Sequence, residues 1–390
     1  MRWPALRAVA LVSCLVGTAA SAQVPDVPPY QGIYQPQGVD ERGQWMEADE
    51  HERLMRDSNL LIRDPALNDY VKGVLCRTVG EDRCRNVRIY ILRAPFFNAA
   101  MNANGAMEVN TGLLLRSRSE GELAWVLAHE FAHFEQRHTL RQFRVDRTSS
   151  DIAAWVTLVA ATMNSQTNIN IIMFSARRRF SRDQEREADI LGLGYIRRTG
   201  YRPQVAAEVW RRRMDEADAI AVGRGLRIQR YDRTPFFATH PTNLERASYL
   251  TTLAGAEVPD RNDGAESYAT AMRPWLAQFL DDQVRLNDFD GSEYLIAELA
   301  ARGWTADLLY ARGELYRMRG NPRDLVNAAD FYRRSIELDA THAEAFRGLG
   351  LALLRAQVQE EGRQALARYL ALKPDASDAP MIRMLAGQGS

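Results

Sequence analysis

The chain has 390 residues, with 50 Lys or Arg and 50 Asp or Glu, so its formal net charge is zero. This balance gives no electrostatic reason to expect a nucleic-acid partner. A hydrophobic content of 46% is ample for a folded core, and the length favours two domains over one.

Residues 1–22 have the pattern of an export signal. Two arginines precede an apolar run over residues 8–19, and a small-residue cleavage site follows that run. We therefore expect a mature chain that begins at Gln23 and resides in the periplasm. Cys14 could instead be the lipidated residue of a lipoprotein box, but the apolar run continues past it, which favours ordinary cleavage. No later segment has the roughly 20 apolar residues that a membrane-spanning helix needs.

After cleavage two cysteines remain, Cys76 and Cys84, with a polar Gly-Glu-Asp turn between them. In an oxidising compartment, cysteines placed in this way predict a local disulfide. Neither cysteine has neighbours typical of a metal site or of a catalytic nucleophile.

Residues 23–109 contain irregular, helical and extended patterns. Residues 23–43 are rich in Pro, Gly and Gln, and we expect them to form an irregular lead-in. Helical patterns follow over residues 45–62 and 65–79, and residues 87–92 have the composition of a strand. Residues 99–109 contain an Asn-Gly pair, the strongest short signal of a hairpin. This hairpin could offer an edge along which an extended peptide lies, or it could be purely structural.

Residues 129–133 read His-Glu-Phe-Ala-His inside an otherwise apolar helix pattern. His129 and His133 share one helix face and can offer two imidazole nitrogens to a single Zn²⁺. Glu130 can then reach a metal-bound water rather than the metal. The alternative of two hydrogen-bonded core histidines is disfavoured, because a Glu and two His are costly to bury without partners.

A second motif lies on a helix that we predict to begin at Ser181 and to end at Gly200. Glu185 and Asp189 are four residues apart and share a face with Gly192, which allows close helix packing. A catalytic zinc site needs three protein ligands, so we choose Glu185 as the third. Asp189 can accept an N–H from a ligand histidine and fix its tautomer. Without the first motif, a solvated charged face would be the better interpretation.

Together the two motifs resemble the M48 metallopeptidases, whose signature is HExxH followed by ExxxD on a later helix. Residues 98–114 and 239–241 support the resemblance, which covers about residues 44–250. It implies a zincin-like fold, one zinc ion per chain and protein substrates. The signal and the helical tail are similar to the periplasmic branch of this family, the beta-barrel assembly-enhancing protease group of outer-membrane quality control. The site residues that the resemblance implies are the zinc ligands His129, His133 and Glu185 and the catalytic base Glu130.

Three further features lie between and beyond the motifs. Residues 152–163 are apolar and predict a buried helix, with a lid or a surface for membrane or unfolded clients as alternatives. His138 has the pattern of a solvated helix residue. His240 precedes a proline, which favours an extended conformation at a turn. It could donate to the oxyanion of the tetrahedral intermediate, bind zinc as a fourth ligand that keeps the enzyme latent, or be a structural turn residue.

The tail has helical composition with regular breaks. Two of its segments align with a 34-residue period, the length of a tetratricopeptide (TPR) repeat. Residues 321–323 look like an insertion, and residues 268–301 could form a third unit. We expect the tail to pack on the peptidase domain, as a binding surface for proteins or as a scaffold. The residues that match the repeat pattern are Gly313, Tyr316, Ala328, Tyr332, Phe346, Leu349, Gly350, Leu366 and Pro374.

The sequence thus predicts an α+β, mostly helical protein. A zinc peptidase domain with a small hairpin or sheet occupies residues 44–262, and a TPR-like helical solenoid occupies residues 263–390. The predicted activity is hydrolysis of peptide bonds in misfolded or unassembled envelope proteins. The competing prediction is a chaperone or assembly factor with a latent zinc site, whose repeats bind outer-membrane clients or an assembly-machinery partner. A peripheral contact with the membrane is compatible with both.

Overall fold

The computed structural model describes residues 34–147, 169–229, 231, 243–257 and 259–388. For residues 169–181, which lie within these ranges, it describes the backbone alone. The expected export signal with Cys14, the apolar run 152–163 and His240 lie outside the described residues. Within the described ranges, no helix is both long and apolar enough to cross a membrane.

The protein is an α+β structure that is mostly helical, with a small four-stranded sheet, which confirms the predicted fold class. The strands are β1 (Leu61–Ile62), β2 (Arg88–Leu92), β3 (Ala99–Met101) and β4 (Ala106–Asn110). The helices before the tail are α1 (Gly38–Asp57), α2 (Pro65–Val79), α3 (Glu81–Cys84), α4 (Thr111–Arg116), α5 (Glu120–Glu135), α7 (Ile169–Arg197), α8 (Val205–Gly223) and α9 (Asn243–Ala254), with a further helix over residues 138–147. The tail contains α10 (Ala265–Val284), α11 (Phe289–Leu299), the short 3₁₀ helix η1 (Ala300–Arg302), α12 (Ala306–Arg319), α13 (Pro322–Leu338), α14 (Ala343–Arg355), α15 (Gln359–Leu372) and α16 (Ala379–Leu385).

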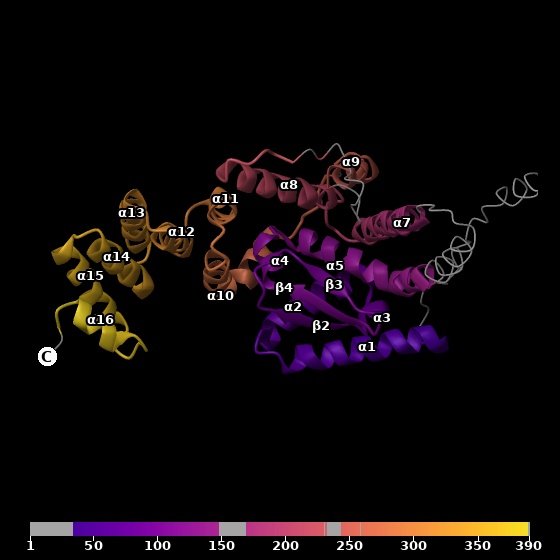
Figure 1. The fold of residues 1–390 in the computed structure, drawn as a ribbon, viewed down its shortest axis with the longest axis horizontal. Coiled ribbons are helices and arrows are strands. Elements are labelled where there is room, and N and C mark those ends of the chain that lie inside the picture. Colours follow the sequence, from indigo (N-terminus) through magenta and orange to yellow (C-terminus); the bar gives the residue numbers. More distant parts are fainter. Residues whose placement is uncertain (1–33, 148–168, 230, 232–242, 258, 389–390) are drawn as a thin grey trace, which may run out of the picture.

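The sheet has the strand order β1-β2-β4-β3, with β2 and β4 parallel and both outer pairs antiparallel. Helices α2 and α5 cover the face on which Ile91 and Val109 are buried, and α1 crosses the other face (Figure 1). The strand predicted over residues 87–92 and the hairpin predicted over residues 99–109 are confirmed. Gly105 supplies the positive φ, 87°, of the hairpin turn. Among the described residues β3 pairs only with β4, so it is an edge strand.

Two predicted helix boundaries are wrong. Helix α1 begins at Gly38, inside the expected irregular lead-in, and it ends before β1 begins. The early start is stabilised by Glu41, whose carboxylate accepts the backbone N–H of Gln37 at 2.6 Å and lies in the first helical turn. Helix α7 begins at Ile169 rather than at Ser181, so the second motif lies in the middle of a long helix.

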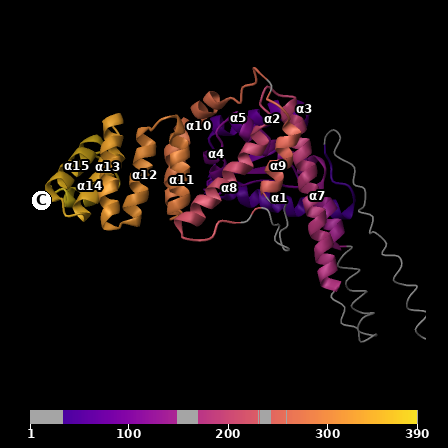
Figure 2. The same ribbon diagram turned by 90° about the horizontal axis from the view of Figure 1, so that it is seen from above.

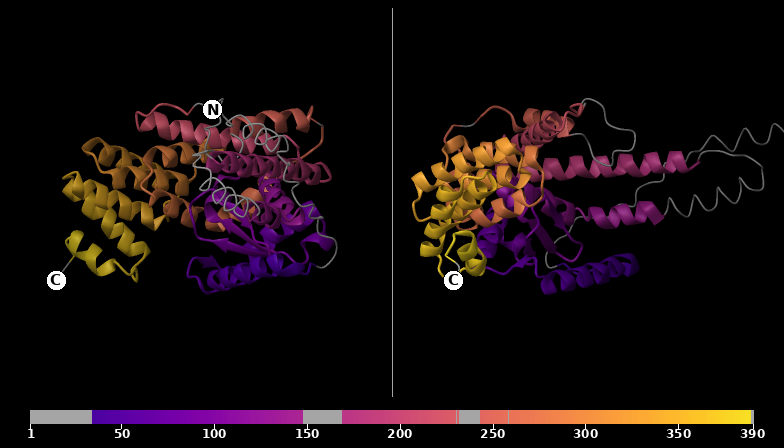
Figure 3. Two further views of the ribbon diagram at one scale, coloured as in Figure 1. Left: turned by 45° about the vertical axis from the view of Figure 1, so that its right-hand side comes forward. Right: turned by 60° about the vertical axis from the view of Figure 1, so that its left-hand side comes forward.

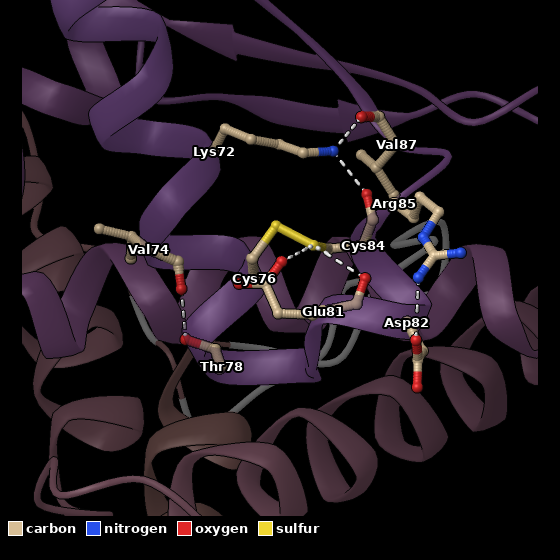
Figure 4. Close-up of a disulfide and its surroundings, with 9 residues drawn as sticks. All are labelled: Lys72, Val74, Cys76, Thr78, Glu81, Asp82, Cys84, Arg85 and Val87. Carbon is tan, nitrogen blue, oxygen red and sulfur yellow. Dashed lines mark hydrogen bonds and ion pairs between the residues drawn. A yellow bond between two sulfur atoms is a disulfide. The ribbon is translucent and has the colours of Figure 1, made fainter.

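The sulfur atoms of Cys76 and Cys84 are bonded to each other and join the end of α2 to α3 (Figure 4). Gly80 between them has a φ of 101°, a conformation that favours glycine, where α2 ends. The Lys72 ammonium donates to the carbonyl oxygens of Cys84 and Val87. This corner therefore fixes the point from which β2 starts.

One hydrophobic core runs across the domain boundary expected between residues 262 and 263. Trp125 on α5 and Ile196 on α7 are buried in the same cluster as Phe279 on α10 and Leu295 on α11. The first tail helices thus pack on the peptidase part, and smaller separate clusters hold the later tail helices together.

Helices α12 to α15 form consecutive hairpins that lead away from the peptidase part in a row (Figure 2). Glycines of the predicted repeat allow this packing. A Cβ at Gly313 would lie 2.6 Å from the ring of Tyr332, and one at Gly350 would lie 2.5 Å from Leu366. Residues 321–323, interpreted above as an insertion in the repeat, form the capped start of α13.

Candidate active site

Helix α5 carries the His-Glu-Phe-Ala-His motif into the centre of the peptidase part. Its start is fixed by Ser119, whose hydroxyl accepts the backbone N–H of Glu122 at 3.2 Å. Every residue from Gly121 to His129 is buried, because this stretch is almost entirely small or apolar. The motif histidines are therefore held on a rigid element of the core.

Helix α7 lies alongside α5 and brings the second motif to the first (Figure 3). The two helices approach closely at Gly192, where an added Cβ would lie 3.3 Å from both the backbone N and the Cα of His129. Gly192 thus has the packing role that its position in the sequence predicts. As a result, Glu185 and Asp189 are buried directly beside the motif histidines.

His129, His133 and Glu185 converge on one point. The Nε2 atoms of the two histidines are 3.1 Å apart, and each lies 3.6 Å from a different carboxylate oxygen of Glu185. Three atoms bound to one zinc ion at tetrahedral angles lie roughly 3.3–3.5 Å apart. Two imidazoles and one carboxylate are also the donor set of many catalytic zinc sites. The residues present therefore fit a zinc ion.

Asp189 lies against the far side of the His129 ring. Its Oδ1 is 2.9 Å from Nδ1 of His129. A carboxylate only accepts hydrogen bonds, so Nδ1 carries a proton and Nε2 is the nitrogen that faces His133 and Glu185. The hydroxyl of Tyr249 and the guanidinium of Arg246, both on α9, also donate to Asp189. This buried carboxylate is thus held from three directions.

Arg246 is a site residue that the motifs do not predict. It is 5% exposed, and its Nη1 and Nε lie 3.2 Å from Glu185 and 2.8 Å from Asp189. Its guanidinium also stacks 3.8 Å from the ring centroid of Trp210. One signal was available in the sequence: Arg246 shares the buried face of α9 with Leu250, and a charged residue on such a face requires a buried partner.

His138 is 3% exposed, so its interpretation as a solvated helix residue is wrong. That interpretation requires α5 to continue, but the chain turns at Arg137, which has a φ of 54°. The turn brings Nδ1 of His138 to 2.9 Å from Nδ1 of His133. Nε2 of His138 lies 3.1 Å from Oε2 of Glu187 on α7.

Burial and close charges shift the protonation equilibria of the motif. Burial opposes protonation of His129, yet its hydrogen bonds to Asp189 and Glu185 raise its pKa to about 9. Burial, together with the neighbouring His129, lowers the pKa of His133 to about 3. Burial is the largest cause of the raised pKa of Glu130, about 7, and the Glu185 carboxylate adds to it. A metal ion would compete with a proton at His129, so binding should release a proton.

A small cavity adjoins His133 on the side of the sheet. Its lining includes Met101 of the edge strand β3, Asn102 of the hairpin turn, and Glu41 and Gln44 of α1. The Oε1 atom of Gln44 is buried without a hydrogen-bond partner. The end of the edge strand and the cluster of His129, His133 and Glu185 therefore border the same space.

Residues 63–254 match the family model described as Peptidase family M48. This stretch, which carries both motifs, is thus similar to the M48 peptidases. The resemblance predicted from the paired motifs is thereby confirmed. M48 peptidases are metal-dependent, and the cluster of two histidines and one glutamate is a group in this domain that can hold the metal.

Proteins with similar sequences include two kinds of M48 peptidase. The chain is 31% identical over 181 residues to the mitochondrial metalloendopeptidase OMA1 of Schizosaccharomyces pombe. The aligned region covers 45% of this chain and 50% of that protein. It is 25% identical over 255 residues to the beta-barrel assembly-enhancing protease of Escherichia coli, and the aligned region covers 62% of this chain and 47% of that protein. It is 26% identical over 247 residues to the protein of the same name from Yersinia pestis, and the aligned region covers 59% of this chain and 48% of that protein. The match thus spans about half the length of these relatives.

Proposed function

We propose that this protein is an exported zinc-dependent endopeptidase that hydrolyses peptide bonds of misfolded or unassembled envelope proteins. The observation that carries the proposal is the convergence of His129, His133 and Glu185 at separations that suit one zinc ion. We assign these three side chains as the ligands of one ion per chain.

The reaction that suits this site is attack of water on a scissile carbonyl. Bound by these residues, a zinc ion would supply the Lewis acidity that lowers the pKa of the water and polarises the carbonyl. Glu130 takes the proton of that water and passes it to the leaving amine. Its pKa, raised to about 7 mainly by burial, suits a group that must both accept and return a proton near neutral pH.

The edge strand β3 is our candidate for substrate binding. Its outer edge lies free of other described strands, and Met101 borders the cavity beside His133. An extended peptide added to this edge would be held by main-chain hydrogen bonds, which tolerate many sequences. Such tolerance suits a protease for misfolded proteins.

The envelope location rests on three features. Two of the relatives are named beta-barrel assembly-enhancing proteases. Cys76 and Cys84 are joined in a disulfide, which is typical of an oxidising compartment. The sequence of residues 1–22 has the pattern of an export signal. We propose further that the tail is a TPR-like solenoid that binds clients or assembly machinery.

His240 remains a proposed site residue. It stands six positions before Arg246, which contacts both acidic residues of the site. It either donates to the oxyanion or binds zinc as a fourth ligand. His240→Ala separates the two roles, because it lowers activity in the first case and raises it in the second.

A chaperone or assembly factor with a latent site is the second candidate, favoured by the row of tail helices (Figure 2). The test compares cleavage of a labelled unfolded protein by the chain from Gln23 onward with cleavage by Glu130→Gln. Glu135→Gln is the matched control, because Glu135 lies on the same helix but bonds Arg83, 2.8 Å away.

We expect Glu130→Gln to keep its zinc and to lose roughly 10²–10⁴-fold in cleavage rate, with Glu135→Gln unaffected. An inactive wild type beside an active His240→Ala variant would indicate a self-inhibited protease. Glu130→Gln that cleaves at the wild-type rate contradicts the mechanism. Absence of zinc and of cleavage in every variant would leave the binding scaffold as the function.

A further inference from the structure

His133 contacts a second histidine that the proposed reaction does not use. The Nδ1 atoms of His133 and His138 are 2.9 Å apart, and their rings meet edge to face with centroids 4.9 Å apart. On its other side, His138 faces Oε2 of Glu187, 3.1 Å from its Nε2. Arg141 donates to the same oxygen at 2.9 Å. An unbroken chain of side chains therefore runs from the metal-ligand cluster to α7.

Only one arrangement of protons satisfies this chain. His133 presents Nε2 to the ligand cluster, so its Nδ1 must carry the hydrogen and donate it. Nδ1 of His138 must then accept, which leaves the hydrogen of this neutral ring on Nε2. That N–H meets the carboxylate of Glu187, which can only accept. Each donor in the chain thus finds an acceptor.

We propose that His138, anchored by Glu187, is a positioning residue that fixes the tautomer and the ring orientation of His133. The inference rests on the proposed function, in which His133 is a zinc ligand. Metal-binding histidines generally donate their second N–H to a carboxylate, a carbonyl or water, and this contact tunes the affinity for the metal. In this protein an imidazole takes that place and passes the contact on to a carboxylate.

The local fold is built to place the ring of His138. Arg137 has a left-handed backbone, uncommon for a residue with a side chain, and its guanidinium pairs with the buried carboxylate of Glu41. The backbone of His138 is held by Gln184 of α7, whose side-chain amide donates to the His138 carbonyl oxygen at 2.9 Å. Contacts from α1 and α7 therefore fix the backbone of this turn, and the ring of His138 is held in turn by its contacts with His133 and Glu187.

The two histidine ligands are thus oriented by one helix. His129 donates directly to Asp189, and His133 reaches Glu187 through His138. Both carboxylates belong to α7, which also supplies the third ligand. The affinity for zinc should therefore depend on His138, which lies outside both motifs, and on Glu187, which lies between Glu185 and Asp189 in the sequence.

The test measures zinc affinity of the chain from Gln23 onward by competition with a fluorescent chelator, with the visible spectrum of the Co²⁺-loaded protein as a second readout. His138→Phe removes the acceptor and keeps the ring. His138→Asn restores an acceptor oxygen near the position of Nδ1. Glu187→Gln removes the negative charge of the side chain that accepts the Nε2–H of His138, which weakens this hydrogen bond. His342→Phe is the control, since this histidine lies in the tail and bonds Asp307.

We expect His138→Phe to bind zinc roughly 10–100-fold more weakly and to change the Co²⁺ spectrum. His138→Asn should recover most of that loss, Glu187→Gln should lose affinity by about 3–10-fold, and His342→Phe should match the wild type. Recovery by His138→Asn is the result that a merely structural role for this residue would not give.

The outcomes separate this inference from the proposed function. A wild type that binds no zinc contradicts the function itself. A wild type that binds zinc while His138→Phe binds it equally well overturns only the positioning role, and so does an equal loss in His138→Phe and His138→Asn. If His138→Phe does not fold, wild-type affinity in both His138→Asn and Glu187→Gln overturns the inference, and weakened affinity in Glu187→Gln supports it.

Discussion

A Cβ at Gly192 would lie 3.3 Å from both the backbone N and the Cα of His129, so α5 and α7 touch through a glycine. The atoms that such a Cβ would meet are backbone atoms, which cannot rotate aside as a side chain does. The distance from Glu185 to the two histidines therefore depends on the absence of a side chain at this position.

We expect Gly192→Ala to push α7 away from α5, to destabilise the protein by about 1–3 kcal/mol and to weaken zinc binding. Gly194→Ala is the matched control, because nothing lies within 4 Å of a Cβ added there. At that position alanine should stabilise the helix by up to about 1 kcal/mol. Urea unfolding and chelator competition would measure both effects. The same sign of change in the two variants would contradict the packing argument.

Arg246 offers a second test, of the charge balance in the site. Arg246→Met leaves the buried carboxylates of Glu185 and Asp189 without their cationic partner, which should cost roughly 3–5 kcal/mol in urea unfolding of the metal-free protein. Arg246→Lys should fall in between, since lysine keeps the charge but loses the forked contact and the stacking on Trp210.

The control for this prediction is Arg42→Met, which removes an exposed arginine from α1. Its effect should stay within about 0.5 kcal/mol. If Arg246→Met unfolds at the same urea concentration as Arg42→Met, the buried ion pairs contribute nothing to stability.

The motif residues could be predicted because their relationships are local. A spacing of four along a helix places His129 above His133, and Glu185 above Asp189, whatever the tertiary structure. The close packing of α5 and α7 was also predictable from a local pattern, since Gly192 shares a helix face with Glu185 and Asp189. The strand and the hairpin before α5 were predictable for the same reason, from short patterns and an Asn-Gly turn.

The remaining site residues depend on turns and on contacts between distant segments. In an uninterrupted α5, five residues would rotate His138 by about 140° away from His133. The turn that brings it back occurs at Arg137, a residue type that gives no sign of a positive φ. Arg246 bonds Asp189 across 57 positions, so its place on the apolar face of α9 indicates that it needs a buried partner but not which residue supplies it.

Acid should destabilise the contact between α1 and the sheet. Glu52 is 4% exposed and accepts hydrogen bonds from Arg88, Tyr90 and Asn104 at 2.5–2.8 Å. Burial acts to raise its pKa, but the hydrogen bonds from Arg88 and Tyr90 outweigh it and lower the pKa to about 2. Because this folded-state pKa lies below the ordinary value of 4.5, the stabilisation is complete above about pH 4.5 and is lost as the pH falls through about 2.

Glu52→Gln should therefore unfold at a lower urea concentration than the wild type at pH 6, by about 1–3 kcal/mol. The difference should shrink as the pH is lowered below about 4.5, because the wild-type carboxyl becomes neutral as well. Urea titrations at several pH values measure this directly. A difference that grows towards low pH would reverse the predicted sign.

The disulfide should stabilise the corner that leads into β2. Cys76 and Cys84 are eight positions apart, and a bond across so short a loop contributes about 2.5 kcal/mol in the chain-entropy account. Thermal unfolding with and without reductant should show this loss in the wild type, whereas the double variant Cys76→Ser and Cys84→Ser should not respond to reductant. A wild type indifferent to reductant would mean that the bond contributes nothing.

The most direct test of the central claim is the zinc content of the purified chain from Gln23 onward, measured by mass spectrometry after identical dialysis of each variant. The wild type and Asp183→Ala, which changes an exposed residue of α7, should each carry about one zinc per chain. His133→Ala and Glu185→Ala should carry little. A wild type without zinc, or a Glu185→Ala variant with as much zinc as the wild type, would contradict the assignment of this site.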